Sequence, residues 1–341
     1  MENKHTASDL AQMQALPLET KIRMTQYRIR EWYEHWQGDV YVSWSGGKDS
    51  TVLKHIVDQM YDDVPSVFSN MGLEYPEIQK LVFDTKKGLY DCLRPNVVIL
   101  YPEIRFDKVI ELYGYPVISK ETAECIYEAK KCIESGGKIY QYRLKKIKGE
   151  ILDKEGNKSK YNQDHWAFLM DAPFKISHLC CNEMKKKPFK KYEHGTGRKP
   201  IIATMASESR LRKTKWIQQG CNSFTGAKPS SKPMSFWTEQ DVLEYIVKYN
   251  VPLAECYGKI QPVGQSDGQM FIDGFHDKLC TSKMKRTGCM FCMFRGASGE
   301  RAELIPDDER NTSKTVRLLY QQTRYRRGSG LYQRHQAGDH F

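Results

Sequence analysis

The stretch that most constrains the fold is an apolar, β-branched run that enters a glycine-rich turn and leaves it as a helix-like run, from Val40 to Leu53. The turn reads Ser-Gly-Gly-Lys-Asp-Ser over residues 45–50. Two glycines let the backbone turn sharply and come close to a ligand. Serine and lysine side chains beside the amides of a helix start suit a phosphate group. The spacing is not that of the Walker pattern. The turn therefore predicts a phosphate site of another type, with an ordinary glycine-rich turn as the alternative.

The order of the remaining elements predicts an α/β protein. Short hydrophobic runs alternate with helical patterns, which favours a doubly wound parallel sheet. Residues 1–15 show little pattern and are expected to be loosely ordered. Ser119 and Thr238 are expected to cap helices, the latter with Asp241 at the third helical position. The expected strands are 40–43, 64–68, 96–101 and 200–205, and the expected helices are 18–36, 51–60, 77–87, 106–113, 120–132 and one that opens at 178.

A length of 341 residues suggests one large domain or two modest ones. We expect an N-terminal helical segment at 1–39, a nucleotide-binding domain at 40–235, and a C-terminal helical, cysteine-bearing region with a basic tail at 236–341. A basic stretch with weak periodicity at about 134–165 indicates an insertion, either a solvated loop or flexible lid, or a nucleic-acid-binding arm.

The charge balance favours polyanionic partners. Lysine and arginine exceed aspartate and glutamate by 53 − 42 = 11. Such an excess suits nucleotides or a nucleic acid, although a solvated basic surface would look the same. The chain has no run of 18 apolar residues and no apolar signal core, so we expect a cytoplasmic protein without a membrane partner.

Ten cysteines in such a chain indicate metal or redox chemistry rather than a disulfide framework. Cys280, Cys289 and Cys292 follow the spacing C-x8-C-x2-C, and the adjacent pair Cys180 and Cys181 lies about a hundred residues upstream. A C-x-x-C pair beside two more cysteines can hold zinc or an iron–sulfur cluster. The other five are expected to be core residues, and two of them, Cys221 and Cys256, are also candidates for a reactive role; the five are Cys92, Cys125, Cys132, Cys221 and Cys256.

The six-residue turn resembles the PP-loop, S-G-G-x-D-S, of the ATP pyrophosphatase superfamily. That superfamily includes ATP sulfurylase small subunits, phosphoadenosine phosphosulfate (PAPS) reductases and enzymes that thiolate tRNA or DNA. Residues 70–77, 114–120, 206–212 and 232–242 are similar to the PAPS reductase family, although Asn70-Met71 stands where that family often has Asp-Thr. The resemblance covers roughly residues 18–295 and implies an adenine nucleotide alpha hydrolase-like (HUP-type) fold.

The resemblance also implies site residues. Catalytic roles would fall to Lys48, Asp49 and Arg210, although Arg210 and Arg212 each read equally well as a surface residue at a helix start. A bound ATP, or adenylyl sulfate (APS) or PAPS in its place, would be accompanied by Mg²⁺. The implied nucleotide-binding residues are Ser43, Ser45, Gly46, Gly47, Lys48, Asp49, Ser50, Gly72, Glu74, Lys120 and Arg212.

Two resemblances favour a [4Fe–4S] cluster over structural zinc. An adjacent cysteine pair with a distant C-x-x-C resembles the cluster pattern of APS reductases. The phrase at 287–292 resembles cluster-bearing PAPS-reductase-like proteins from bacteria and phages. Lysines at 185–187 would offset the negative charge of a thiolate-bound cluster. The expected ligands are Cys181, Cys280, Cys289 and Cys292, with Cys180 as the alternative to Cys280 or Cys181.

Three functions follow as hypotheses. The first is an enzyme that binds ATP, cleaves it between the α- and β-phosphates and couples adenylation to cluster-dependent sulfur transfer to tRNA or DNA, with a cysteine desulfurase or a thiol reductant as partner. The second is an APS or PAPS reductase that releases sulfite. The third is a non-enzymatic nucleotide-binding partner with a structural metal. The intact loop favours ATP, and the sequence has no cysteine after Cys292, where thiol-dependent reductases carry a mobile one. A basic helix expected at 311–327 suits phosphate backbones, and the oligomeric state is left open.

Overall fold

The computed structural model describes residues 3–226, 228–263, 278–290 and 292. These residues belong to one compact unit, Met1–Ala297. The helix expected at 311–327 and the basic tail lie outside the described residues. Within the described part, no helix combines the length and the apolar character needed to cross a membrane.

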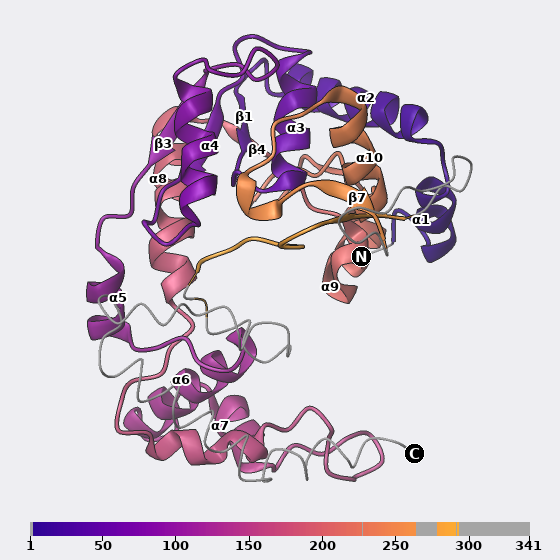
Figure 1. Cartoon of the computed structure of the whole chain (residues 1–341). Helices are drawn as coiled ribbons and strands as arrows, with labels where there is room; N and C mark the ends of the chain where they lie inside the picture. Colours follow the sequence, from indigo (N-terminus) through magenta and orange to yellow (C-terminus); the bar gives the residue numbers. More distant parts are fainter. Residues whose placement is uncertain (1–2, 227, 264–277, 291, 293–341) are drawn as a thin grey trace. The chain divides into compact units, whose positions relative to one another are not determined.

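A mostly parallel sheet forms the centre of the unit, with the strand order β3-β2-β1-β4-β6-β5 (Figure 1). Every neighbouring pair in it is parallel except β5 and β6. The four longer strands confirm the expected α/β sheet, whereas β5 and β6 are two-residue polar strands that the sequence did not predict. The strands are β1 (Val40–Ser43), β2 (Ser66–Ser69), β3 (Val97–Leu100), β4 (Lys199–Ile202), β5 (Asn222–Ser223) and β6 (Ser230–Ser231).

Strand β1 is buried on both faces, which is why its sequence reads as an almost continuous apolar run. Val40 and Val42 point into the main core and are fully buried. Tyr41, one residue out of phase, points to the opposite face and donates its hydroxyl to Glu193 of α8 at 2.8 Å. Helices therefore cover both faces of the sheet, as expected for a doubly wound fold.

The helices agree closely with the expected segments, apart from α1, α7 and α9, which the sequence did not predict. The sequence did not predict α1, because the capping box between Thr6 and Asp9 lies in a stretch without clear periodicity. Ser119 and Thr238 are confirmed as N-caps; the Ser119 hydroxyl accepts from the amide of the third helical residue. The helices are α1 (Ala7–Gln14), α2 (Leu18–His35), α3 (Lys48–Asp58), α4 (Pro76–Lys86), α5 (Phe106–Tyr113), α6 (Lys120–Glu134), α7 (Gln141–Lys148), α8 (Lys187–Thr196), α9 (Arg210–Gln219) and α10 (Glu239–Tyr249).

The N-terminal helices and α10 share the core of the sheet. Trp32 of α2 and Val242 of α10 are fully buried in it. Lys21 of α2 donates to Asp241 of α10 at 2.7 Å, and both side chains are nearly inaccessible to solvent. Helices α2 and α10 thus pack into the same core as the sheet.

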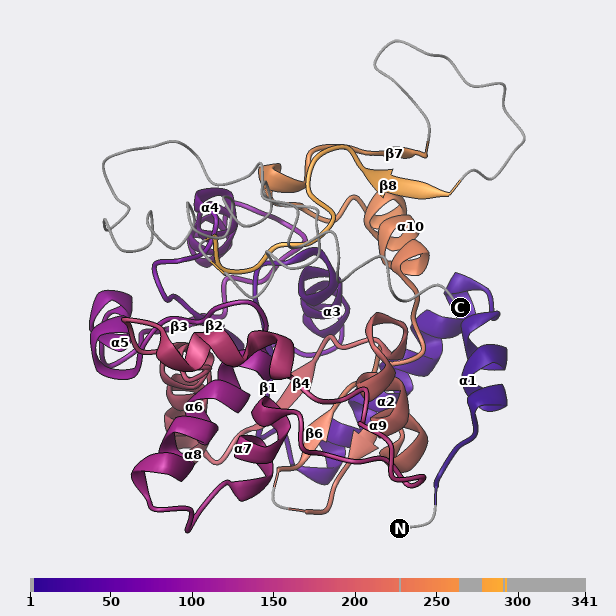
Figure 2. The same ribbon diagram turned by 90° about the horizontal axis from the view of Figure 1, so that it is seen from below.

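The basic stretch expected as a solvated loop or lid is folded. Helices α6 and α7 lie side by side (Figure 2), and with a 3₁₀ segment at Asp164–Asp171 they enclose a small core that includes Ile126 and Ile147. Lys146 is buried and pairs with Glu121 at 2.5 Å. The apolar positions of α7 were hidden among lysines, so the sequence showed the charge and not the packing.

The order of the strands marks where a ligand should bind. β2 and β3 lie on one side of β1, whereas β4 and β6 lie on the other. In open α/β sheets the crevice at such a switch point, at the carboxyl ends of the strands, is the usual ligand site. The turn at 45–50 follows β1 and residues 203–209 follow β4, so the two candidate phosphate-binding segments meet at this edge.

Candidate nucleotide and cysteine sites

The glycine-rich turn has the backbone that its sequence demands. Gly46 has a φ of +69°, and a Cβ built there would lie 2.7 Å from the Cγ2 of Ile78. Gly47 precedes α3 without a side-chain cap. The hydroxyl of Ser50 accepts from the Ser45 amide at 3.2 Å and donates to the Gly47 carbonyl at 3.0 Å. The turn is thus held open at the start of α3, where helix amides favour an anion.

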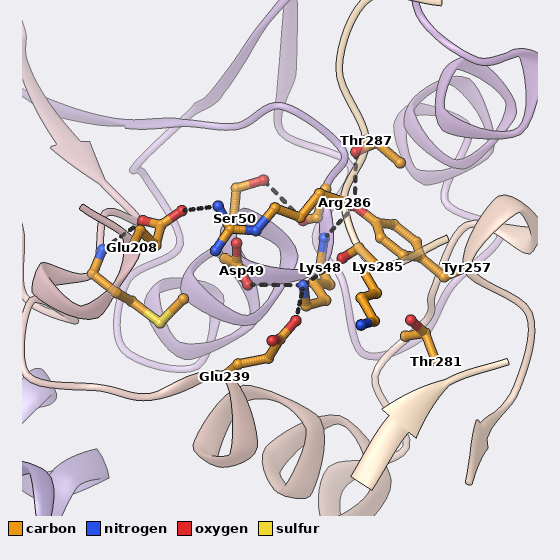
Figure 3. Close-up of polar contacts among 12 residues, drawn as sticks. Lys48, Asp49, Ser50, Glu208, Glu239, Tyr257, Thr281, Lys285, Arg286 and Thr287 are labelled. Carbon is orange, nitrogen blue, oxygen red and sulfur yellow. Dashed lines mark hydrogen bonds and ion pairs between the residues drawn. The ribbon is translucent and has the colours of Figure 1, made fainter. Parts of the chain in front are cut away.

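The turn at 45–50 and the residues that contact Lys48 form what we call the socket, and the Lys48 ammonium is its central group. The side chain is buried, and its Nζ lies 2.8 Å from the Lys285 carbonyl oxygen, 2.9 Å from Glu239 Oε1 and 3.9 Å from Asp49 Oδ1 (Figure 3). Oxygen acceptors from three parts of the chain therefore surround it. A nucleotide phosphate presents the same kind of acceptor.

Tyr257 is a further residue of the socket, although no sequence pattern indicated it. Its hydroxyl accepts from the Lys48 amide at 3.3 Å and lies 2.7 Å from Thr287 Oγ1. Burial raises its pKa to about 12, so the hydroxyl stays protonated and neutral. No motif surrounds this tyrosine, and only the fold brings it to the turn.

The segment after β4 contributes a carboxylate and a guanidinium. Glu208 accepts from the Met205 amide at 3.0 Å and pairs with Arg212. Burial raises the pKa of Asp49, while Lys48 and Arg212 are among the cations that oppose this rise. Arg212 is thus in electrostatic contact with the turn.

Arg210, expected as catalytic, lies exposed at the first position of α9. Arg212 is exposed as well, but it pairs with Glu208 and is among the cations that oppose the rise in the pKa of Asp49. Ser43 ends β1 and is partly buried beside the turn.

In the loop after β2, Gly72 and Glu74 both shape the backbone. Gly72 takes a φ of +71°, a left-handed value that glycine adopts more readily than other residues. Glu74, expected to contact nucleotide, is buried and accepts from the Met71 and Leu73 amides at 3.1 and 3.3 Å. It therefore holds the loop in shape. Beside the loop lies a cavity of about 500 Å³ lined by Asn70, Met71, Gly72, Leu73, Tyr101, Pro102, Arg105, Phe106 and Asp107.

Cys180 and Cys181 lie at the start of the helical segment that leads through a π-helix, Asn182–Lys186, into α8. Their sulfurs are 4.0 Å apart. The hydrogen bond from Cys180, helped by Lys185, Lys120 and Lys186, lowers the pKa of Cys181, and the same bond raises the pKa of Cys180. Lys120, expected at the nucleotide, thus belongs to the surroundings of Cys181.

Cys289 and Cys292 approach the same place. Burial raises the pKa of Cys289 to about 11, and the charges of Cys292 and Cys181 add to the rise while Lys185 opposes it. Cys289 and Cys180 also pack against one apolar cluster built on Met71, Val109 and Met184. We call Cys180, Cys181, Cys289 and Cys292 the cysteine site.

Cys280 does not join the cysteine site, although it was an expected ligand. It lies in β8 (Leu279–Thr281), where its sulfur contacts the carbonyl of Pro262 in the paired strand β7 (Ile260–Pro262) at 3.9 Å. Cys180, which was the alternative ligand, lies beside Cys181. Cys221 and Cys256 are buried and burial raises the pKa of both thiols, which argues against the reactive role considered for them.

The cysteine site fits a thiolate-bound group in its chemistry. All ten cysteines are free thiols. Four of them converge, and three lysines favour the thiolate of Cys181. As the described side chains stand, no three His, Cys, Asp or Glu residues are already placed to share a single metal ion.

Comparison with known proteins agrees with the sequence-based resemblance. Residues 39–134 match the family model of the phosphoadenosine phosphosulfate reductase domain, a segment that includes β1, the turn, α3 and the loop after β2. This match confirms the PAPS reductase-like resemblance. The crystal structure of phosphoadenylyl-sulfate (PAPS) reductase from Candida auris, in a phosphate complex, aligns with a TM-score of 0.38 and 12% identity over 74% of this chain and 91% of that chain. No curated protein matches the chain.

Proposed function

We propose that this chain is a PP-loop enzyme that binds ATP in the socket around Lys48 and couples cleavage between the α- and β-phosphates to sulfur transfer at the cysteine site. The observation that carries the proposal is the continuity of the two sites. Residues 282–290 contact the Lys48 ammonium through the Lys285 carbonyl and also carry Cys289. A nucleotide and a set of thiols would therefore share one edge of the sheet.

The socket has a group for each charge that forms during adenylation. The amides at the start of α3 and the Lys48 ammonium would hold the β- and γ-phosphates. Arg212, at the start of α9, would contact the same phosphates. An oxygen of the acceptor attacks the α-phosphorus, the bond to the bridging oxygen breaks, and pyrophosphate leaves. The cations stabilise the charge that develops on the leaving group. Asp49, whose Oδ1 has no hydrogen-bond partner, offers the oxygen ligand that Mg²⁺ prefers.

Sulfur then replaces the activated oxygen. Sulfide attacks the carbon of the adenylated acceptor, a C–S bond forms, and AMP leaves with the oxygen. The cysteine site would hold a [4Fe–4S] cluster through Cys180, Cys181, Cys289 and Cys292. When bound, such a cluster supplies an iron centre with affinity for sulfur.

A nucleic acid is the acceptor class that the charge favours. The folded insertion presents lysines together with exposed tyrosines, including Tyr140, Tyr142 and Tyr161. Aromatic rings beside cations suit the bases and phosphates of a single strand. We therefore propose tRNA or DNA as the acceptor.

The second candidate is a sulfonucleotide reductase, and the match of residues 39–134 favours it. The same socket would hold APS or PAPS, and a thiol reductant would supply two electrons as sulfite leaves. Cys221 and Cys256 are too deeply buried to act as that thiol.

Product analysis separates these functions. The protein, purified and reduced without oxygen, is incubated with α-labelled ATP, APS or PAPS, with and without bulk tRNA or DNA and sulfide. Acceptor-dependent release of AMP and pyrophosphate from ATP supports the first function, and sulfite from APS or PAPS supports the second and overturns the first. Lys48→Met removes the ammonium with little change in volume and should abolish either activity. Tight nucleotide binding without turnover of any of the three would instead indicate a non-enzymatic binding partner.

A further inference from the structure

The segment that joins the two sites is residues 282–290, which we call the strap. It leaves β8 where the Ser282 amide donates to the Lys259 carbonyl at 2.8 Å. It then runs past the PP-loop and ends beside the loop that follows β2. Its contacts with these two places differ in kind.

At the socket the strap makes polar contacts with the machinery that would hold phosphate. The Lys285 carbonyl accepts from the Lys48 ammonium at 2.8 Å, and Thr287 Oγ1 lies 2.7 Å from the Tyr257 hydroxyl. Arg286, between them, reaches back across the start of α3 toward Glu208, with 3.8 Å between the charged atoms (Figure 3). A phosphate at Lys48 would add negative charge within reach of this guanidinium.

At the cysteine site the strap is held by a backbone hydrogen bond and by apolar packing. The Met290 amide donates to the Leu73 carbonyl at 2.8 Å. Cys289 packs in the apolar cluster that also contains Cys180. Only Gly288 separates Thr287 from Cys289, so their Cα atoms are no more than about 7 Å apart. Movement of one end of the strap is therefore transmitted to the other.

We propose that the strap couples nucleotide binding to the cysteine site, so that a nucleotide held at Lys48 fixes the strap and shields Cys289 and Cys292. The inference rests on the nucleotide socket of the proposed function, but it does not depend on which reaction follows. Cys292 is included because its amide donates to the Cys289 carbonyl at 3.2 Å. Coupling of this kind is reciprocal, so modification of the thiols should in turn weaken nucleotide binding.

Thiol labelling tests the coupling directly. The reduced, metal-free protein is treated with N-ethylmaleimide with and without a saturating non-hydrolysable ATP analogue, and the rate at each cysteine is read by mass spectrometry. We expect labelling of Cys289 and Cys292 to slow by at least about fivefold, the lower end of common coupling. Cys280 is the internal control, because it contacts Pro262 outside the strap, and its rate should not change.

A matched pair of variants tests the route. Thr287→Val keeps the shape of the side chain but removes its contact with Tyr257, and it should cancel most of the protection while the analogue still binds. Thr196→Val makes the same substitution at an exposed position at the end of α8 and should preserve the protection.

The outcomes separate this inference from the proposed function. Equilibrium dialysis measures analogue binding independently of labelling. Bound analogue with unchanged or faster labelling of Cys289 and Cys292 overturns the coupling and leaves the proposed function intact. Failure of the analogue to bind at all overturns the proposed function itself.

Discussion

Glu239 pairs with the ammonium that we propose to hold a nucleotide phosphate, and its replacement gives a quantitative prediction. Its Oε1 lies 2.9 Å from the Lys48 ammonium, and the carboxylate is half-exposed at the first turn of α10. A nucleotide must displace this carboxylate and then tolerate its charge nearby. Glu239→Gln removes that charge and keeps the size of the side chain, so it should tighten nucleotide binding.

The magnitude follows from the exposure of the pair. Lys48 is buried but Glu239 is half-exposed, and an ion pair whose carboxylate faces solvent contributes about 1 kcal/mol. Repulsion between a carboxylate and a phosphate about 4 Å apart adds about 1 kcal/mol in water-like surroundings. Allowing for the hydrogen bond that glutamine still accepts, we expect a net gain of about 1 kcal/mol, or about fivefold in Kd.

Calorimetric titration with a non-hydrolysable ATP analogue measures this change. Glu244→Gln is the matched control, because it removes the same charge from α10 on the far side, where the side chain lines a surface groove with Leu18 and Val247. Unchanged or weaker binding by Glu239→Gln, with normal binding by the control, would refute the view that Glu239 competes with phosphate for Lys48.

Three further substitutions test other parts of the account. Gly46→Ala places a Cβ 2.7 Å from an isoleucine carbon at a left-handed φ, so chemical denaturation should show a loss of about 2–4 kcal/mol in unfolding free energy. The hydrogen bond from Cys180 and the charge of Lys185 lower the pKa of Cys181, so its alkylation rate should reach half its maximum below the pH of about 8.5 usual for cysteine, and Lys185→Ala should raise that midpoint. Asp241→Ala leaves the buried ammonium of Lys21 without its carboxylate partner, so denaturation should show a loss of about 3–5 kcal/mol in unfolding free energy. Asp107→Ala, at an exposed position, should change the unfolding free energy little.

The central sheet and the turn could be predicted from the sequence because each depends on local patterns. A β-branched run before Ser-Gly-Gly-Lys-Asp-Ser specifies β1, a sharp turn and α3 almost regardless of what surrounds them. The caps at Ser119 and Thr238 are similarly local. By contrast, β5 and β6 are two polar residues each, and no periodicity marks so short a strand.

The composition of the sites depended on contacts between distant segments. Glu239 and Tyr257 reach Lys48 only because α10 and the segment after it pack against α3. Spacing grouped Cys280 with the C-x-x-C pair, but the hairpin of β7 and β8 holds it against Pro262, whereas Cys180 and Cys289 pack against one apolar cluster. Residue type and spacing indicated thiol chemistry, whereas the choice of thiols required the fold.

The most direct test of the central claim is titration of the full chain with the non-hydrolysable ATP analogue, comparing the unmodified protein with Lys48→Met. If the turn at 45–50 is the phosphate socket, the unmodified protein binds one equivalent. Loss of the charge-assisted contacts of Lys48, about 1.5–3 kcal/mol, then weakens binding by roughly 10- to 150-fold. Equal affinities in a Lys48→Met protein that unfolds like the parent would contradict the account.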